Sequence, residues 1–207
     1  MIYFAGILVI GGTGAGGAQT SVEFWSPNVT CTLKNYPRGL AGGPTVNLVS
    51  ETLIGCYLNY CDIFQNGSWQ INWKHTNAER MGHSSVLLEE DSDGDVYIIL
   101  LGGSSSNSTE VILVDETPPY IGPLSIRHGQ GHCTIMLSDE RMVITGGSGT
   151  EKFVTQYEDY GSGHEISLSP MGKERTYHAC GVYYFDYVNS TVPVSKWLSK
   201  TYKARHL

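Results

Sequence analysis

The sequence predicts an all-β protein built from repeated four-stranded antiparallel units. Three observations predict it: glycine pairs recur after apolar runs, arginines recur at nearly the same spacing, and the composition suits strands. Of 207 residues, 25 are glycine and 16% are charged, and the chain contains 13 Tyr, 4 Trp and 5 Phe. Aromatic residues favour strands, and frequent glycine favours tight turns, so this balance indicates short strands rather than long solvated helices.

The glycine pairs give the first period. Apolar runs end in Gly-Gly at 11–12, 102–103 and 146–147, so that the last two pairs are 44 residues apart and the first two are 91 apart. Midway between the first two pairs lies a degenerate copy, in which Gly55 is followed by Cys56. A fixed period of this length is the signature of a repeat architecture.

The arginines give the second period. Arg38, Arg80, Arg127 and Arg175 are separated by 42, 47 and 48 residues, and an apolar stretch follows each of them. We interpret these arginines as mainly structural, bonded to nearby backbone, with a binding role left open for one or two. Histidine follows three of them, at His83, His132 and His178. Equivalent residues of successive units lie too far apart for one tetrahedral metal site, so these histidines are also predicted to be structural.

Each unit divides into four strands. In the unit of residues 81–127, strands are predicted at about 83–88, 96–101, 110–115 and 120–126, with a hairpin turn at 91–94. The remaining units are 1–38, 39–80 and 128–175, and a further unit begins at 176–192. Residues 193–207 do not fit the pattern.

These units resemble the kelch repeat. In that pattern an apolar strand ends in Gly-Gly, an aromatic-containing strand follows, a Trp lies near the outer strand, and an Arg leads to the next unit. The matching segments are 22–27, 62–64 with Trp69, 111–115 and 153–157, although Trp69 is the only outer-strand Trp. The resemblance implies a kelch-type β-propeller with about four blades. Because propellers of this family usually close with six or seven, it implies an incomplete ring that missing blades or another chain would complete.

Two other motifs favour turns over ligand sites. Residues 12–17 match the dinucleotide-binding pattern G-x-G-x-x-G, but a strand-like segment follows where that fold requires a helix. Five carboxylates in residues 89–95 lack the glycine and glutamate positions of a calcium loop, so they indicate a solvated hairpin turn. No catalytic set is visible, and we predict neither a cofactor nor a metal.

Cysteines and sequons bear on the compartment. Cys56 and Cys61 are predicted to be linked across a hairpin, whereas Cys133 and Cys180 are predicted to be buried thiols on neighbouring inner strands. Four sites fit Asn-X-Ser/Thr and are candidates for glycosylation, which favours the secretory route over the cytoplasm. They are Asn28, Asn66, Asn107 and Asn189.

The predicted function is a protein-binding module. Two alternatives follow from the resemblance: a fragment of a secreted oxidase similar to galactose oxidase, and the substrate-recognition part of a ubiquitin-ligase adaptor. A net charge of -7 disfavours nucleic acid, and no apolar run is long enough to span a membrane. Partners are predicted to meet the loops 13–19, 104–109 and 148–152, with Arg80 and Arg127 contributing most.

Overall fold

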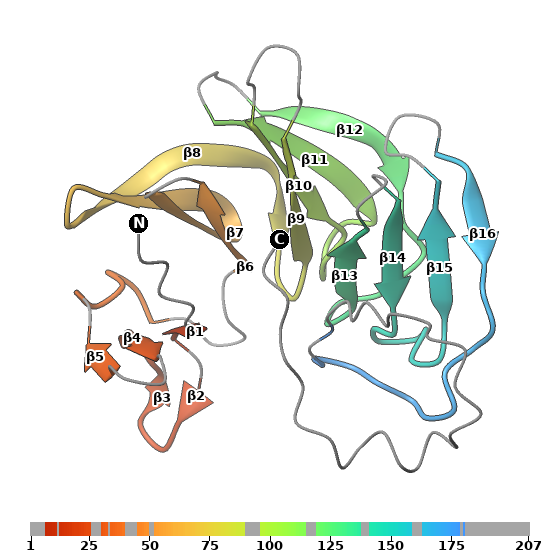
Figure 1. Ribbon diagram of the computed structural model, residues 1–207, viewed down its shortest axis with the longest axis horizontal. Helices are drawn as coiled ribbons and strands as arrows, with labels where there is room; N and C mark the ends of the chain where they lie inside the picture. The colour runs from red at the N-terminus through yellow and green to blue at the C-terminus, as the bar shows by residue number, and fades with distance from the viewer. Residues whose placement is uncertain are drawn as a thin grey trace, which may run out of the picture.

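The computed structural model describes residues 7–11, 13–25, 30–32, 34–39, 45–49, 52–89, 96–114, 119–137, 141–158, 163–178 and 180. Every regular element in these ranges is a β-strand, and all strand pairs are antiparallel. No helix in the described residues has the length and apolar character needed to cross a bilayer. The sheets stack one after another in chain order (Figure 1).

The first sheet contains β1 (Ile7–Ile10), β4 (Val22–Trp25) and β5 (Thr30–Thr32) in the order β1-β4-β5. Between β1 and β4, the strands β2 (Thr13–Gly14) and β3 (Gly17–Ala18) form a small hairpin. The glycine-rich run therefore forms a turn, as predicted. A strand follows it, and no helix N-terminus is present there to hold a dinucleotide phosphate.

The second sheet contains β6 (Thr45–Val49), β7 (Thr52–Gln65) and β8 (Ser68–Arg80). The predicted disulfide Cys56–Cys61 is confirmed, with 4.1 Å between the two Cα atoms. Five extended residues would separate these atoms by roughly 17 Å. The chain of β7 therefore reverses between the two cysteines, where Leu58 has a φ of 54°. The first half of β7 pairs with β6 and the second half with β8.

The third and fourth sheets each contain four strands in up-and-down order. The third consists of β9 (Ser84–Glu89), β10 (Val96–Leu101), β11 (Ser108–Leu113) and β12 (Tyr120–Ser125), and these positions agree with the predicted strands to within two residues. The fourth consists of β13 (Cys133–Met136), β14 (Met142–Thr145), β15 (Val154–Tyr157) and β16 (Glu165–Ser167).

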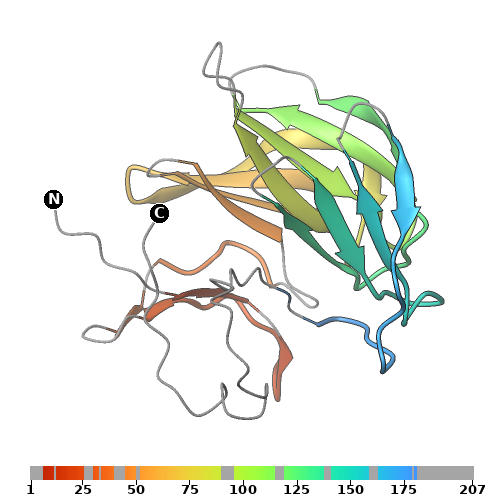
Figure 2. The same ribbon diagram turned by 45° about the vertical axis from the view of Figure 1, so that its right-hand side comes forward.

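Apolar side chains fill the spaces between successive sheets. Because side chains alternate along a strand, Ile99 of β10 packs with Met142 and Ile144 of the fourth sheet, whereas Ile98 packs with Ile54 of the second. Both faces of the third sheet are thus buried, which explains the continuous apolar run of β10. A third cluster, around Val22, Tyr36, Tyr57 and Tyr60, joins the first sheet to the second. Figure 2 shows the last three sheets side by side.

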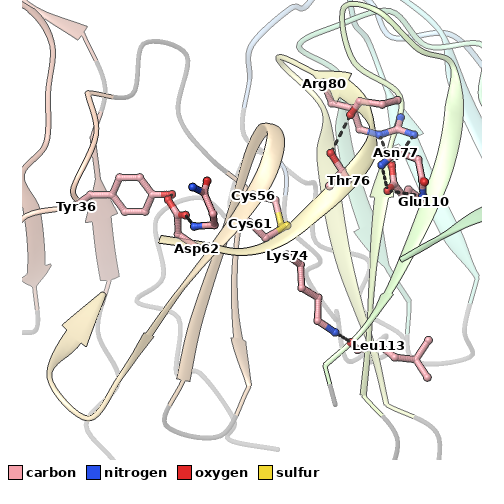
Figure 3. The surroundings of a disulfide bond; sticks show 12 residues. Tyr36, Cys56, Cys61, Asp62, Lys74, Thr76, Asn77, Arg80, Glu110 and Leu113 are labelled. Atoms are coloured by element: carbon pink, nitrogen blue, oxygen red, sulfur yellow. Dashed lines mark hydrogen bonds and ion pairs between the residues drawn. A yellow bond between two sulfur atoms is a disulfide. The ribbon is translucent and has the colours of Figure 1, made fainter. Parts of the chain in front are cut away.

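Two of the periodic arginines, Arg80 and Arg38, form a polar clamp between a link and the sheet that follows it. Arg80, at the end of β8, is fully buried and lies 3.4 Å from the Glu110 carboxylate on β11 (Figure 3). Its guanidinium also donates hydrogen bonds to the carbonyls of Gly102 (2.8 Å) and Ser108 (2.7 Å). One guanidinium therefore fixes the end of β8, the glycine-pair loop and β11 together.

The second sheet is clamped in the same way. Arg38 lies 3.4 Å from the Asp62 carboxylate, which also accepts a 2.6 Å hydrogen bond from the Tyr36 hydroxyl. The Arg38 guanidinium additionally lies 3.7 Å from the centre of the Tyr60 ring. The two arginines thus have equivalent partners on the third strand position of successive units.

We predict that the Arg80–Glu110 clamp is required for stability. The R80M variant leaves the Glu110 carboxylate buried without its cation and should lower the free energy of unfolding by about 3–5 kcal/mol, whereas R80M/E110M should recover most of that loss. Urea denaturation measures both. R175M, at an exposed arginine, is the matched control and should change the value by less than about 0.5 kcal/mol. Equal losses in R80M and R175M would contradict the prediction.

The expectation that Cys133 and Cys180 are buried thiols is wrong. They form a disulfide with 6.1 Å between their Cα atoms, and both are only partly buried. Cys133 begins β13 directly after His132, and Cys180 lies in nearly the same position after His178. Successive units bring these equivalent positions side by side, which places the two sulfur atoms within bonding distance.

We predict that the two disulfides stabilise the fold unequally. In the loop-entropy description, a bridge across 47 residues stabilises by about 4 kcal/mol, and a bridge across 5 by about 2 kcal/mol. Replacing Cys133 and Cys180 with serine should therefore lower the free energy of unfolding about twice as much as replacing Cys56 and Cys61. Chemical denaturation of the two double variants measures this ratio, and a larger loss at Cys56–Cys61 would contradict it.

Candidate functional site: a polar pocket between two glycine-pair loops

An open, polar pocket of about 430 Å³ lies where the glycine-pair loops of the third and fourth sheets meet. Its walls are the loops that follow β10 and β14, and its base is the link between the two sheets. The lining residues are 103–107, 126–129 and 148–150. These segments include two of the three loops that the sequence analysis assigned to the partner-binding face.

The glycine pairs permit the close approach that forms the pocket. Gly146 and Gly147 have φ values of 67° and 100°, which residues with a side chain rarely adopt. A Cβ atom at Gly147 would lie 2.4 Å from the Gly129 carbonyl oxygen, which is too close for any side chain. Loop and link therefore meet backbone to backbone.

His128 supports the base of the pocket. Its Nδ1 lies 2.7 Å from the Gly146 carbonyl and its Nε2 lies 2.9 Å from the Thr155 hydroxyl, so Nδ1 donates and Nε2 accepts. Burial lowers the pKa of His128, which favours this neutral form. Thr155 pairs with Ile144 of β14 as Glu110 pairs with Leu100 of β10. His128 thus occupies the place of the buried arginine in a neutral version of the clamp.

His132 and Ser84 form a buried hydrogen-bonded pair below the pocket. The Ser84 hydroxyl lies 2.8 Å from His132 Nε2, and His132 Nδ1 lies 2.8 Å from the Gly129 carbonyl. Burial lowers the pKa of His132 to about 4, so the ring is neutral at pH 7. A serine–histidine pair can act as a nucleophile, but here both side chains are buried and the third partner is a backbone carbonyl rather than a carboxylate. The geometry is that of a structural pair.

Arg127 is the cationic side chain among the residues that line the pocket. It is 76% exposed, and its guanidinium lies 3.5 Å from the Glu165 carboxylate at the rim of the fourth sheet. The other predicted arginines lie elsewhere. Arg80 is fully buried, Arg38 is 27% exposed and stacked on Tyr60, and the backbone of Arg175 bonds the loop beside Gly147.

The described sequons occupy different surfaces. Asn66 lies exposed at the tip of the hairpin between β7 and β8, whereas Asn107 lies exposed on the wall of the pocket. Asn28 and Asn189 fall outside the described residues. Within the described ranges, no three His, Cys, Asp or Glu side chains are arranged to hold a metal ion.

The comparisons identify a fold. Neither a family model nor a curated protein sequence matches the chain. Among solved structures, YjhT is similar, with a TM-score of 0.57, 12% sequence identity, and coverage of 85% of this chain and 67% of that one. At this identity the similarity shows the fold alone, and it supports an all-β protein of several antiparallel sheets.

Sequence reasoning missed two residues near the pocket, His128 and Tyr177. In the sequence, Arg80 and Arg175 lie three residues before His83 and His178, whereas Arg127 lies five residues before the equivalent His132. That difference could have shown that Arg127 is displaced from the clamp and that His128 acts there. Tyr177 occupies the place of Gly82 and Gly131, one residue before each histidine, which could have marked it as unusual.

We predict that stability falls as the pH drops from about 6.5 to about 4, partly because of His132. Its folded pKa lies below the unfolded value of about 6.5, so the unfolded chain binds more protons in this window and is favoured by acid. The contribution is on the order of 3 kcal/mol. Urea denaturation across this range should show a smaller decrease in H132Q than in the wild type.

H164Q is the matched control for that measurement. His164 is exposed and lies 3.0 Å from Glu158, so its replacement should leave the acid-dependent decrease nearly unchanged. An unchanged decrease in H132Q would show that His132 does not account for the pH dependence.

Proposed function

We propose that the chain is part of a kelch-type β-propeller of about four blades, and that it binds a protein partner through the pocket between the glycine-pair loops. The observation that carries the proposal is an open polar pocket with one exposed guanidinium on a rigid base. The sheet order, the repeated arginine clamp and the similarity to YjhT, a protein of kelch-like fold, support the architecture. Loops held on a rigid scaffold are a frequent site of binding.

The chemistry of the pocket favours binding over catalysis. Its walls offer serine and threonine hydroxyls, the Asn107 amide and backbone groups, all of which can hydrogen-bond a polypeptide. The buried histidines have lowered pKa values and face backbone or hydroxyl partners rather than the pocket mouth. Arg127 can bind a partner's carboxylate in two-pronged geometry.

The two disulfides favour the secretory route over a cytosolic adaptor. Disulfides persist mainly in oxidising compartments, and two are present in a chain of 207 residues. The exposed sequon at Asn66 is compatible with this route. We therefore propose an extracellular or secretory partner.

The test is to isolate a partner by affinity capture with the full chain and to measure its dissociation constant for single variants. R127A should weaken binding about tenfold or more, because it removes the charge at the pocket. The difference in affinity between the wild type and R127A should be smaller at high salt, because salt screens that charge in the wild type. S105W, which fills the pocket wall, should weaken binding further.

N66Q and I71A provide the controls, because both residues are exposed on β7–β8 away from the pocket. They should change the dissociation constant by less than about twofold. Loss of binding in N66Q or I71A with full binding in R127A and S105W would place the partner on the opposite face. Stoichiometric copper in the purified protein would favour the oxidase alternative instead.

A further inference from the structure

Three equivalent backbone positions are joined head to tail across the sheets. The Gly131 amide donates a 2.7 Å hydrogen bond to the Gly82 carbonyl, and the Tyr177 amide donates a 2.7 Å bond to the Gly131 carbonyl. Each of these residues directly precedes a histidine, and each has a positive φ, of 65°, 76° and 52° respectively. The first two are glycines, which adopt this conformation freely, but the third is a tyrosine.

The Tyr177 ring lies against the two glycines. A Cβ atom at Gly131 would come within 2.9 Å of the ring, and one at Gly82 within 3.2 Å of its Cε1 atom. The Tyr177 hydroxyl accepts a hydrogen bond from the Gln130 amide at 2.5 Å. The ring is therefore held in one orientation, and the residue is nevertheless 56% exposed. An exposed aromatic ring held on strained backbone is typical of functional positions.

Tyr177 is continuous with the pocket. Gln130, which holds the hydroxyl, follows the pocket residue Gly129, and its carbonyl accepts a 3.0 Å hydrogen bond from the amide of the pocket residue Ser148. The pocket and the ring therefore share one supporting link. Arg127 and Tyr177 are two large, exposed side chains supported by this link, and arginine and tyrosine are enriched among residues that dominate binding energy.

We propose that Tyr177 anchors the binding surface by stacking against a ring side chain, proline or aromatic, on a loop of the protein partner. The proposal rests on the proposed function and assigns its main contact. The exposed face of a fixed phenol ring offers a stacking plane at little entropic cost. The adjacent pocket supplies hydroxyl and backbone groups that match peptide amides, and Arg127 takes a neighbouring carboxylate. The sequence-based prediction named Arg80 and Arg127 as the main contacts and did not include Tyr177.

A purely structural role for Tyr177 would give a different result for stability and binding. If the ring only covered the two glycines, removing it would change stability and leave binding intact. Y177G separates the two roles, because glycine at this φ is already tolerated at Gly82 and Gly131. The relief of backbone strain should offset the lost ring contacts, so the melting temperature should stay within about 3 °C of the wild type.

The experiment uses a random phage-displayed peptide library selected on the immobilised full chain. Selected peptides should carry proline or an aromatic residue, and their synthetic forms should bind Y177G about tenfold or more weakly than the wild type by fluorescence anisotropy. Y177F keeps the ring and should bind within about threefold. The matched control is I71A, because Ile71 of β8 is also an apolar side chain and is 52% exposed. I71A should bind as the wild type does.

Four results would overturn the anchor or its assigned ligand. Wild-type affinity in Y177G would remove Tyr177 from the interface, and if R127A still lost binding, the pocket proposal would stand without it. Equal loss in I71A would show a nonspecific effect. Failure to select any peptide would overturn the assignment of a peptide ligand. Binding of oligosaccharides on a glycan array, lost in Y177G and without peptide binding, would assign the ring to a different class of partner.

Discussion

The buried guanidinium of Arg80 is the interaction on which the arrangement of the sheets depends. A charge with no exposed surface is stable only when its hydrogen-bonding groups are matched, and here Glu110, the Gly102 and Ser108 carbonyls and the Ser108 hydroxyl match it. Desolvation lowers the pKa of Arg80 and the Glu110 carboxylate opposes that shift. Because its partners lie on the glycine-pair loop and on β11, the same charge that closes the sheet boundary also sets one wall of the pocket.

The boundary between the third and fourth sheets is joined without a buried charge, and the candidate pocket lies at this boundary. His128 bonds the Gly146 carbonyl and Thr155 as a neutral ring, so no ion has to be removed from water. The arginine of this unit, Arg127, is thereby displaced two residues from the clamp position and remains at the surface. The pocket lies at the boundary where the positive charge has moved outward, which explains why binding is proposed there rather than beside Arg80.

Local patterns in the sequence predicted the features that depend on short segments. The apolar run at Ile98–Leu101 fixed β10, and the spacing of Cys56 and Cys61 predicted a bridge because one hairpin is enough to bring them together. The Cys133–Cys180 bridge was missed because it depends on how closely two units approach, which no segment of either unit encodes alone. Spacing likewise grouped Arg127 with Arg80, whereas the hydrogen bonds assign the clamp to His128.

Tyr177 shows why the missed residues lie at the proposed site. Folding alone favours glycine at this position, since Gly82 and Gly131 adopt the same conformation and accept the same head-to-tail hydrogen bonds. A tyrosine there is strained locally, and the residue gains little from burial because it is 56% exposed. A sequence usually agrees with its fold at every level and departs from it where another requirement intervenes. At Tyr177 we attribute that requirement to contact with a partner. Because Gly82 and Gly131 have no side chains, the ring can lie against them while more than half of the residue stays exposed.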